Sequence, residues 1–146
     1  MEINEITGII VDSAMKVHTA LGPGLLESVY ERCLVHELHK RGLRTASQVP
    51  LPVVYDGALI EGGYRIDILV EDVVIVEVKA AESLIPLHSA QLYSYLKLSD
   101  NRVGLLINFN TTHLRHGIRR VINGRRADAP ATSASSASSA INPRGS

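Results

Sequence analysis

The chain has few of the residues that build disulfides, metal clusters or base-stacking platforms. Cys33 is the only cysteine among 146 residues, which excludes an intrachain disulfide and argues against a cysteine-based metal site. Tryptophan is absent and phenylalanine occurs once, so side chains on which nucleic-acid bases could stack are scarce.

Long hydrophobic segments are also missing. No apolar run approaches the length needed to span a bilayer, and the acidic, polar residues 1–5 differ from the basic start of a signal peptide. We therefore expect a cytoplasmic protein with no membrane partner. A content of 45% hydrophobic and 21% charged residues is typical of one globular domain of this length.

The formal net charge of zero conceals two oppositely charged parts. Residues 1–100 contain 8 Lys and Arg and 14 Asp and Glu, whereas residues 101–146 contain 7 Arg and one Asp. Two interpretations stay open. The basic part could contact phosphate while the acidic part holds a cation, or the two parts neutralise each other within one fold.

Hydrophobic periodicity predicts the order of helices and strands. Spacing of three and four residues predicts helices over 3–20, 25–41 and 86–98. The last has Pro86 in its first turn and an apolar stripe on successive turns, formed by Leu87, Ala90, Tyr93 and Leu96 or Lys97. After Gly42, alternation with period two predicts strands. The expected strands cover residues 49–55, with Pro50 and Pro52 placing the strand at an edge, and residues 59–70, 73–80 and 103–109, with an optional last strand over 114–122.

This order, ααβββαβ with an optional terminal strand, indicates an α/β fold. A strand, a helix and a strand in succession over 73–109 imply a parallel crossover, and hence a mixed central β-sheet flanked by helices. We expect one domain over residues 1–124. Residues 125–146 are rich in Ala and Ser, and we expect them to form a disordered tail without a role in function.

The hairpin between the strands 59–70 and 73–80 has two conceivable registers. A two-residue loop would pair Asp67 with Val76, whereas a three-residue loop would pair it with Glu77. Only the second register gives a wholly apolar face, because it aligns six branched side chains. These are Ile66, Ile68, Val70, Val74, Val76 and Val78.

The second register gathers charged side chains at one end of the hairpin. Asp67, Glu77 and Lys79 then share a face, and two opposed carboxylates repel each other unless a cation lies between them. Two acids and a lysine suit a hard divalent cation and an activated water molecule. The alternative is a set of structural ion pairs that includes Arg65.

Residues on the predicted helices could complete such a site. Glu27 lies in a first helical turn, where the helix dipole alone explains a carboxylate. Glu31, one turn later, borders the apolar stripe and could be a further acid at the cation. The amide of Gln91 could bind a phosphate or orient water, although a surface glutamine is also common.

Four segments resemble a known family. Residues 24–30 read GLLESVY and match the signature, Gly24, Glu27 and Tyr30, that names the GxxExxY protein family. Residues 64–67 (YRID) and 77–80 (EVKA) resemble the two halves of the motif of the PD-(D/E)XK nuclease superfamily. Residues 91–96 (QLYSYL) are similar to the glutamine-bearing helix that follows this motif.

The resemblance implies a restriction-endonuclease-like core and a set of functional residues. Asp67 and Glu77 would be ligands of Mg²⁺ or Mn²⁺, together with the Val78 carbonyl. Lys79 would position or deprotonate the attacking water, while Glu31 and Gln91 would complete the catalytic set. In this sequence Ile66 stands where the motif has proline.

These observations lead to a main hypothesis and two alternatives. The main one is a metal-dependent nuclease that hydrolyses DNA, or RNA, with Arg115, Arg119 and Arg120 contacting backbone phosphates. The first alternative is a non-catalytic module of the same fold that binds nucleic acid or protein. The second is a homo-oligomeric nuclease whose second subunit completes the substrate channel.

Overall fold

The computed structural model describes residues 1–124 as three α-helices, one 3₁₀-helix and seven strands. The helices are α1 (Ile3–Leu21), α2 (Glu27–Lys40), α3 (Pro86–Ser99) and the 3₁₀-helix η1 (Leu114–Gly117). The strands are β1 (Thr45–Pro50), β2 (Val53–Tyr55), β3 (Ala58–Ile60), β4 (Arg65–Val70), β5 (Val74–Lys79), β6 (Val103–Asn108) and β7 (Ile118–Ile122). Residues 125–146, for which a disordered tail was predicted, lie outside the described residues.

Five strands form a mixed central sheet in the order β1-β4-β5-β6-β7. Strands β5 and β6 are parallel and are joined through α3, while the other neighbours are antiparallel. The predicted α/β class and the parallel crossover are thus confirmed. Within residues 1–124, no helix is long and apolar enough to cross a membrane.

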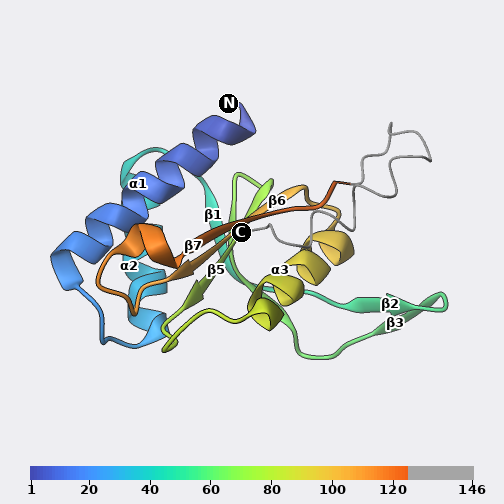
Figure 1. Ribbon diagram of the computed structural model, residues 1–146. Coiled ribbons are helices and arrows are strands. Elements are labelled where there is room, and N and C mark those ends of the chain that lie inside the picture. Colours follow the sequence, from blue (N-terminus) through green and yellow to red (C-terminus); the bar gives the residue numbers. More distant parts are fainter. Residues whose placement is uncertain (125–146) are drawn as a thin grey trace.

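Helices cover both faces of the sheet (Figure 1). Residues of α1 and α2 pack on one face in a core cluster that includes Ile10, Leu34 and Val76. Residues of α3 pack on the other face in a second cluster, which includes Leu92 and Leu106. Each face therefore has its own apolar core, as expected for a sheet between helical layers.

Two of the predicted strands are divided differently in the structure. β1 begins at Thr45, before the predicted start, and ends at Pro50, after which β2 and β3 form a separate two-stranded hairpin. We call this hairpin, Val53 to Ile60, the β2–β3 arm. The arm projects beyond the sheet (Figure 1). The prediction of one strand over residues 59–70 was wrong because residues 61–64, with Gly63 at φ 80°, interrupt it.

Two further predictions need correction. Residues 114–122 contain the short helix η1 before β7, so the last strand is shorter than expected. The buried face of α3 consists of Leu92, Tyr93, Tyr95 and Leu96, whereas Leu87, which the helical spacing aligned with Tyr93 and Leu96, is 70% exposed. Leu87 lies in the first turn, beside the β2–β3 arm and beyond the cover of the sheet.

The β4–β5 hairpin adopts the register that the apolar pattern selected. Val70 pairs with Val74 and Ile68 with Val76, which leaves residues 71–73 as a three-residue connection. This register, extended by one residue, places Asp67 opposite Glu77. The predicted pairing is therefore confirmed for the paired part of the ladder.

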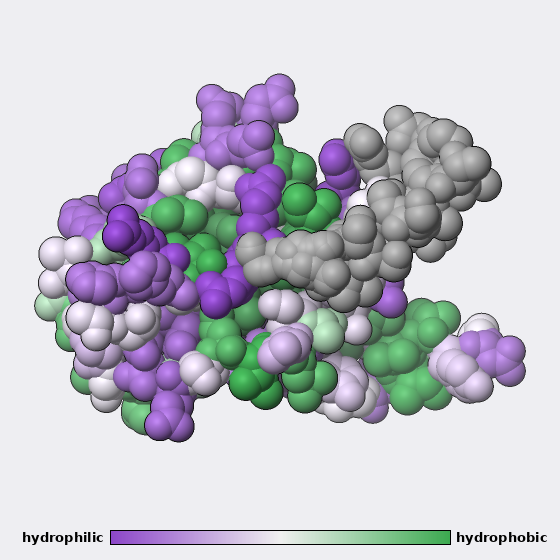
Figure 2. Space-filling model, in the orientation of Figure 1, coloured by the Kyte–Doolittle hydropathy of each residue, from purple (hydrophilic) through white to green (hydrophobic). Residues whose placement is uncertain are grey.

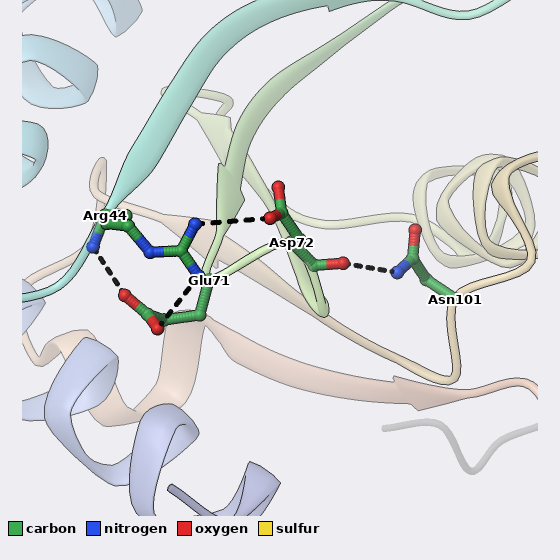
Figure 3. Close-up of polar contacts among 4 residues, drawn as sticks. All are labelled: Arg44, Glu71, Asp72 and Asn101. Atoms are coloured by element: carbon green, nitrogen blue, oxygen red, sulfur yellow. Dashed lines mark hydrogen bonds and ion pairs between the residues drawn. The ribbon is translucent and has the colours of Figure 1, made fainter.

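An ionic network holds the tip of this hairpin, where two non-glycine residues adopt left-handed conformations (Figure 3). Glu71 has φ 52° and Asp72 φ 60°. The Arg44 backbone N–H donates to Oε2 of Glu71 at 2.6 Å, and the Arg44 guanidinium contacts the carboxylates of Glu71 and Asp72. Asn101 donates to the Asp72 carbonyl at 3.1 Å. These contacts offset the strain of the turn and so support the register.

The predicted apolar face is interrupted at Ile66. Five of the six residues assigned to that face lie in the cluster beneath α1 and α2, but Ile66 packs in the cluster beneath α3. The cause lies at the next position, because the β1–β4 pairing skips Gln48 and Asp67, and Gln48 has φ 53°. The regular alternation of side chains therefore ends where the acidic pair begins.

Candidate active site

Asp67 and Glu77 are held by reciprocal hydrogen bonds between the ends of β4 and β5. The Asp67 backbone N–H donates to Oε2 of Glu77 at 2.9 Å, and the Val78 N–H donates to Oδ2 of Asp67 at 2.9 Å. Each carboxylate thus replaces a backbone carbonyl of the other strand as hydrogen-bond acceptor. The bonds orient both acids and explain why the regular ladder stops before them.

A residue that the sequence analysis did not identify, Gln48, connects this pair to a third acid. Its Nε2 atom donates to both carboxylate oxygens of Glu31, at 3.1 and 3.0 Å, and to Oδ1 of Asp67 at 3.3 Å. Gln48 reaches this position from the edge strand β1 through the left-handed conformation noted above. A non-glycine residue in that region costs about 1–3 kcal/mol and often marks a functional site.

The signature residues Gly24 and Tyr30 shape the loop before α2. Tyr30 is fully buried and stacks on Phe109, with ring centroids 4.5 Å apart. Its hydroxyl donates to the Gly22 carbonyl at 2.6 Å and accepts from the Leu25 N–H at 3.0 Å. Gly24 adopts φ 102°, which side-chain-bearing residues rarely adopt. Gly24 and Tyr30 therefore fix where α2 starts.

Fixing the start of α2 places Glu27 at the end of β5. Oε2 of Glu27 accepts a hydrogen bond from the Ala80 N–H at 3.3 Å, immediately after Lys79. Glu31, one turn later on the same helix, reaches Gln48. The first two turns of α2 thus supply two carboxylates to the end of the sheet that carries Asp67 and Glu77.

Lys79 lies beside these acids and lines a cavity. Within residues 1–124 its side chain makes no ion pair or hydrogen bond, yet its charge lowers the pKa of both Asp67 and Glu77. Lys79 and Gln91 both line a cavity of about 450 Å³ between α3 and the β2–β3 arm. The exposed Gln91 and Lys79 thus line the same cavity, whereas Asp67 and Glu77 are not among its lining residues.

The acids carry raised pKa values because Glu77 is buried and Asp67 and Glu31 are partly buried. Burial raises the pKa of Glu77, which is 5% exposed, to about 8, and the neighbouring charge of Asp67 adds to the increase. Burial likewise raises the pKa values of Asp67 and Glu31, against the hydrogen bonds from Gln48, which lower them. A cluster of acids with so little compensating positive charge is typical of a functional site.

The predicted arginines lie elsewhere on the protein. β7 is the edge strand at the opposite side of the sheet from β1. Arg120 donates to Thr7 and Asn4 of α1, and Arg119 donates to the carbonyls of His116 and Ile118. Arg115 is exposed in η1. The structure therefore does not bring these three residues to the acidic pair.

A comparison with protein families places this fold, with its acidic residues at the ends of β4 and β5, among known proteins. A family model described as the PD-(D/E)XK nuclease superfamily matches residues 4–121. The chain belongs to the PD-(D/E)XK nuclease superfamily. No curated protein and no solved structure matches it. The restriction-endonuclease-like fold is consistent with the mixed central sheet and its flanking helices.

Members of this nuclease superfamily generally use divalent metal ions, and their substrates are nucleic acids. No group of three or more His, Cys, Asp or Glu side chains within residues 1–124 is close enough to form a protein-only metal site. The donor chemistry nevertheless fits Mg²⁺, which is commonly held by one or two carboxylates while water and substrate phosphate supply the other ligands. Oε1 of Glu77, which accepts no hydrogen bond within the described part of the chain, is one such donor.

Proposed function

We propose that the protein is a metal-dependent nuclease that hydrolyses phosphodiester bonds in nucleic acid, with DNA as the expected substrate. The single observation that supports this most strongly is the reciprocal bonding of Asp67 and Glu77, with Lys79 two residues further along β5. The bonds hold the two carboxyl groups together although they repel each other once both are ionised, and burial removes Glu77 almost fully and Asp67 partly from water. A divalent cation is the partner that relieves both costs.

In this proposal the oxygen atoms of Asp67 and Glu77 and the carbonyl of Val78 would hold Mg²⁺ or Mn²⁺. When bound, the cation would supply charge neutralisation at the scissile phosphate and a water molecule of lowered pKa. Lys79, unpaired beside the acids, stabilises the negative charge that develops on the phosphate. Gln91 donates its amide to a phosphate oxygen or to the attacking water.

Three residues position this set without contacting the reacting atoms. Gln48 orients the carboxylates of Asp67 and Glu31 by donating to both. Glu27 binds the Ala80 N–H and so fixes the end of β5 next to Lys79. Glu31 contributes negative charge at the cation side, where it raises the pKa of Glu77.

Cleavage of labelled single- and double-stranded DNA and RNA, with Mg²⁺ or Mn²⁺, tests the proposal. Asp67→Asn should reduce the rate by at least about a hundredfold, because the amide removes a charged oxygen donor. The matched control is Asp56→Asn, since Asp56 is an exposed turn residue with φ 53°, a conformation that asparagine tolerates. Metal-dependent cleavage at equal rates by the wild type and Asp67→Asn would refute the assignment.

One observation favours the alternative of a non-catalytic binding module. Each acid already accepts a backbone N–H, and a pKa of about 8 leaves Glu77 protonated at neutral pH, so the pair is stable without a cation. Binding of nucleic acid that is equally strong with EDTA and with Mg²⁺, without cleavage of any of the four substrates, would favour this function.

A further inference from the structure

The cavity that contains Lys79 has a composition that suits one part of a nucleic-acid substrate. It measures about 450 Å³ and lies between α3 and the β2–β3 arm. Its apolar walls come from Val53 at the start of the arm, from Tyr64 just before β4, and from Leu87 and Leu98 on α3. Cavities of about 300–1,000 Å³ with mainly apolar walls and a few polar groups bind small organic molecules or parts of them.

Large hydrophobic side chains at this cavity are exposed. Leu87 is 70% exposed and Tyr64 46% exposed. The Tyr64 ring packs edge-on against Tyr95, with centroids 6.1 Å apart, and lies close to Gly62, where a Cβ atom would approach it to 3.1 Å. These contacts hold the aromatic ring in place while leaving nearly half of the residue open. Figure 2 shows hydrophobic surface along the arm beside this region.

The charges at the cavity select the kind of occupant. Among the described residues that line it, Lys79 is the only Lys, Arg, Asp or Glu, and the other polar groups include Gln91 and Ser94. An apolar peptide would use the walls but not the lysine, and a simple anion would use the lysine but not the walls. A flat aromatic group attached to a phosphate uses both.

We propose that this cavity, the base pocket, binds an unpaired nucleobase of the substrate strand next to the phosphodiester at Lys79. The proposal rests on the proposed nuclease function and specifies its substrate class. A base can enter the pocket only when it is unstacked and unpaired, so the preferred substrate is a single strand or a strand end. The base stacks on Tyr64 and contacts Leu87, since every base has an aromatic face that accepts such contacts.

Binding of short fluorescent oligonucleotides, measured by anisotropy in the presence of EDTA or of Ca²⁺, tests the base pocket. We expect single-stranded DNA to bind at least about tenfold more tightly than the same sequence as a duplex. Tyr64→Ala should weaken single-strand binding about tenfold to a hundredfold, because base stacking contributes on that order, and Tyr64→Phe should restore it. Leu87→Ala should weaken binding by a smaller factor. An RNA strand of the same sequence shows which sugar the site prefers.

Matched control variants distinguish binding in the base pocket from binding elsewhere on the β2–β3 arm. Tyr55 and Leu59 are 73% and 63% exposed on the arm but do not line the cavity, so Tyr55→Ala and Leu59→Ala should leave binding unchanged. Equal affinity for single strand and duplex, or equal effects of Tyr64→Ala and Tyr55→Ala, would overturn the base pocket. Displacement of the oligonucleotide by an apolar peptide with higher affinity would also overturn it.

The two proposals fail in different ways. If Tyr64-dependent binding of single strands occurs without cleavage under any metal condition, the base pocket stands and the nuclease function fails. If Asp67-dependent cleavage occurs at the same rate in the wild type and Tyr64→Ala, with single strand and duplex cut equally, the nuclease function stands and the base pocket fails.

Discussion

Replacing Glu77 by glutamine should change how the stability of the protein depends on pH. Burial and the charge of Asp67 raise the pKa of the Glu77 carboxyl to about 8 in the folded protein, from the usual value of 4.5. Between these two values the folded protein retains a proton that the unfolded chain has lost. Because the folded state then binds more protons, the free energy of unfolding falls as the pH rises.

The size of this effect follows from the linkage relation. One retained proton costs about 1.4 kcal/mol for each pH unit. From about pH 6.5 to about 8, the free energy of unfolding of the wild type should therefore fall by roughly 2 kcal/mol. Glu77→Gln cannot ionise, and its amide oxygen can still accept the Asp67 N–H, so it lacks this decrease.

Urea unfolding of both proteins at several pH values, first in EDTA and then with Mg²⁺, provides the measurement. His88, whose pKa is lowered chiefly by burial and has no contribution from Glu77, affects both proteins alike and cancels in the comparison. Added Mg²⁺ should raise the stability of the wild type near pH 8 and that of Glu77→Gln little, because it binds the ionised acid. Parallel pH dependences of the two proteins in EDTA would refute the reasoning.

Four further changes have defined outcomes. Gln48→Ala removes the amide that lowers the pKa values of Asp67 and Glu31, so the acidic limb of the kcat/KM profile should move to higher pH while the maximal rate persists; an unchanged profile would contradict the positioning role. Tyr30→Phe should lower the free energy of unfolding by about 0.5–1.5 kcal/mol, measured by urea denaturation, because it removes the hydroxyl that bonds to the Gly22 carbonyl and the Leu25 N–H. Gly104→Ala should destabilise by about 1–3 kcal/mol, since its Cβ would lie 2.8 Å from Leu92; Gly8→Ala, with open space on α1, should instead stabilise by about 0.5–1 kcal/mol.

The sequence predicted the parts of the fold that depend on local periodicity. The three α-helices and the register of the β4–β5 hairpin follow from apolar patterns, because a shift of one residue would have exposed a whole row of branched side chains. That register brought Asp67 opposite Glu77, which is why the acidic pair was predictable without a structure.

The remaining features depend on contacts between distant segments. Gln48 lies 19 residues from Asp67, and nothing in its own sequence neighbourhood indicates a left-handed conformation or a link to an acid. The β2–β3 arm has the alternation of a sheet strand, and only the geometry of residues 61–64 separates it from β4. Leu87 fits the helical stripe but lies beyond the sheet.

The last two failures concern the same place, since Leu87 and the arm border the base pocket. Hydrophobic residues that a pattern assigns to the core, but that the fold leaves exposed, frequently mark binding surfaces.

Binding of Mn²⁺, followed by electron paramagnetic resonance of the free ion, tests the central claim most directly. In the proposed function, Asp67 and Glu77 together hold a divalent cation. We expect saturable Mn²⁺ binding that strengthens as the pH rises toward 8, because the cation displaces the Glu77 proton. Both Asp67→Asn and Glu77→Gln should abolish this binding. Saturable binding of the same affinity in the wild type and both variants would contradict this expectation.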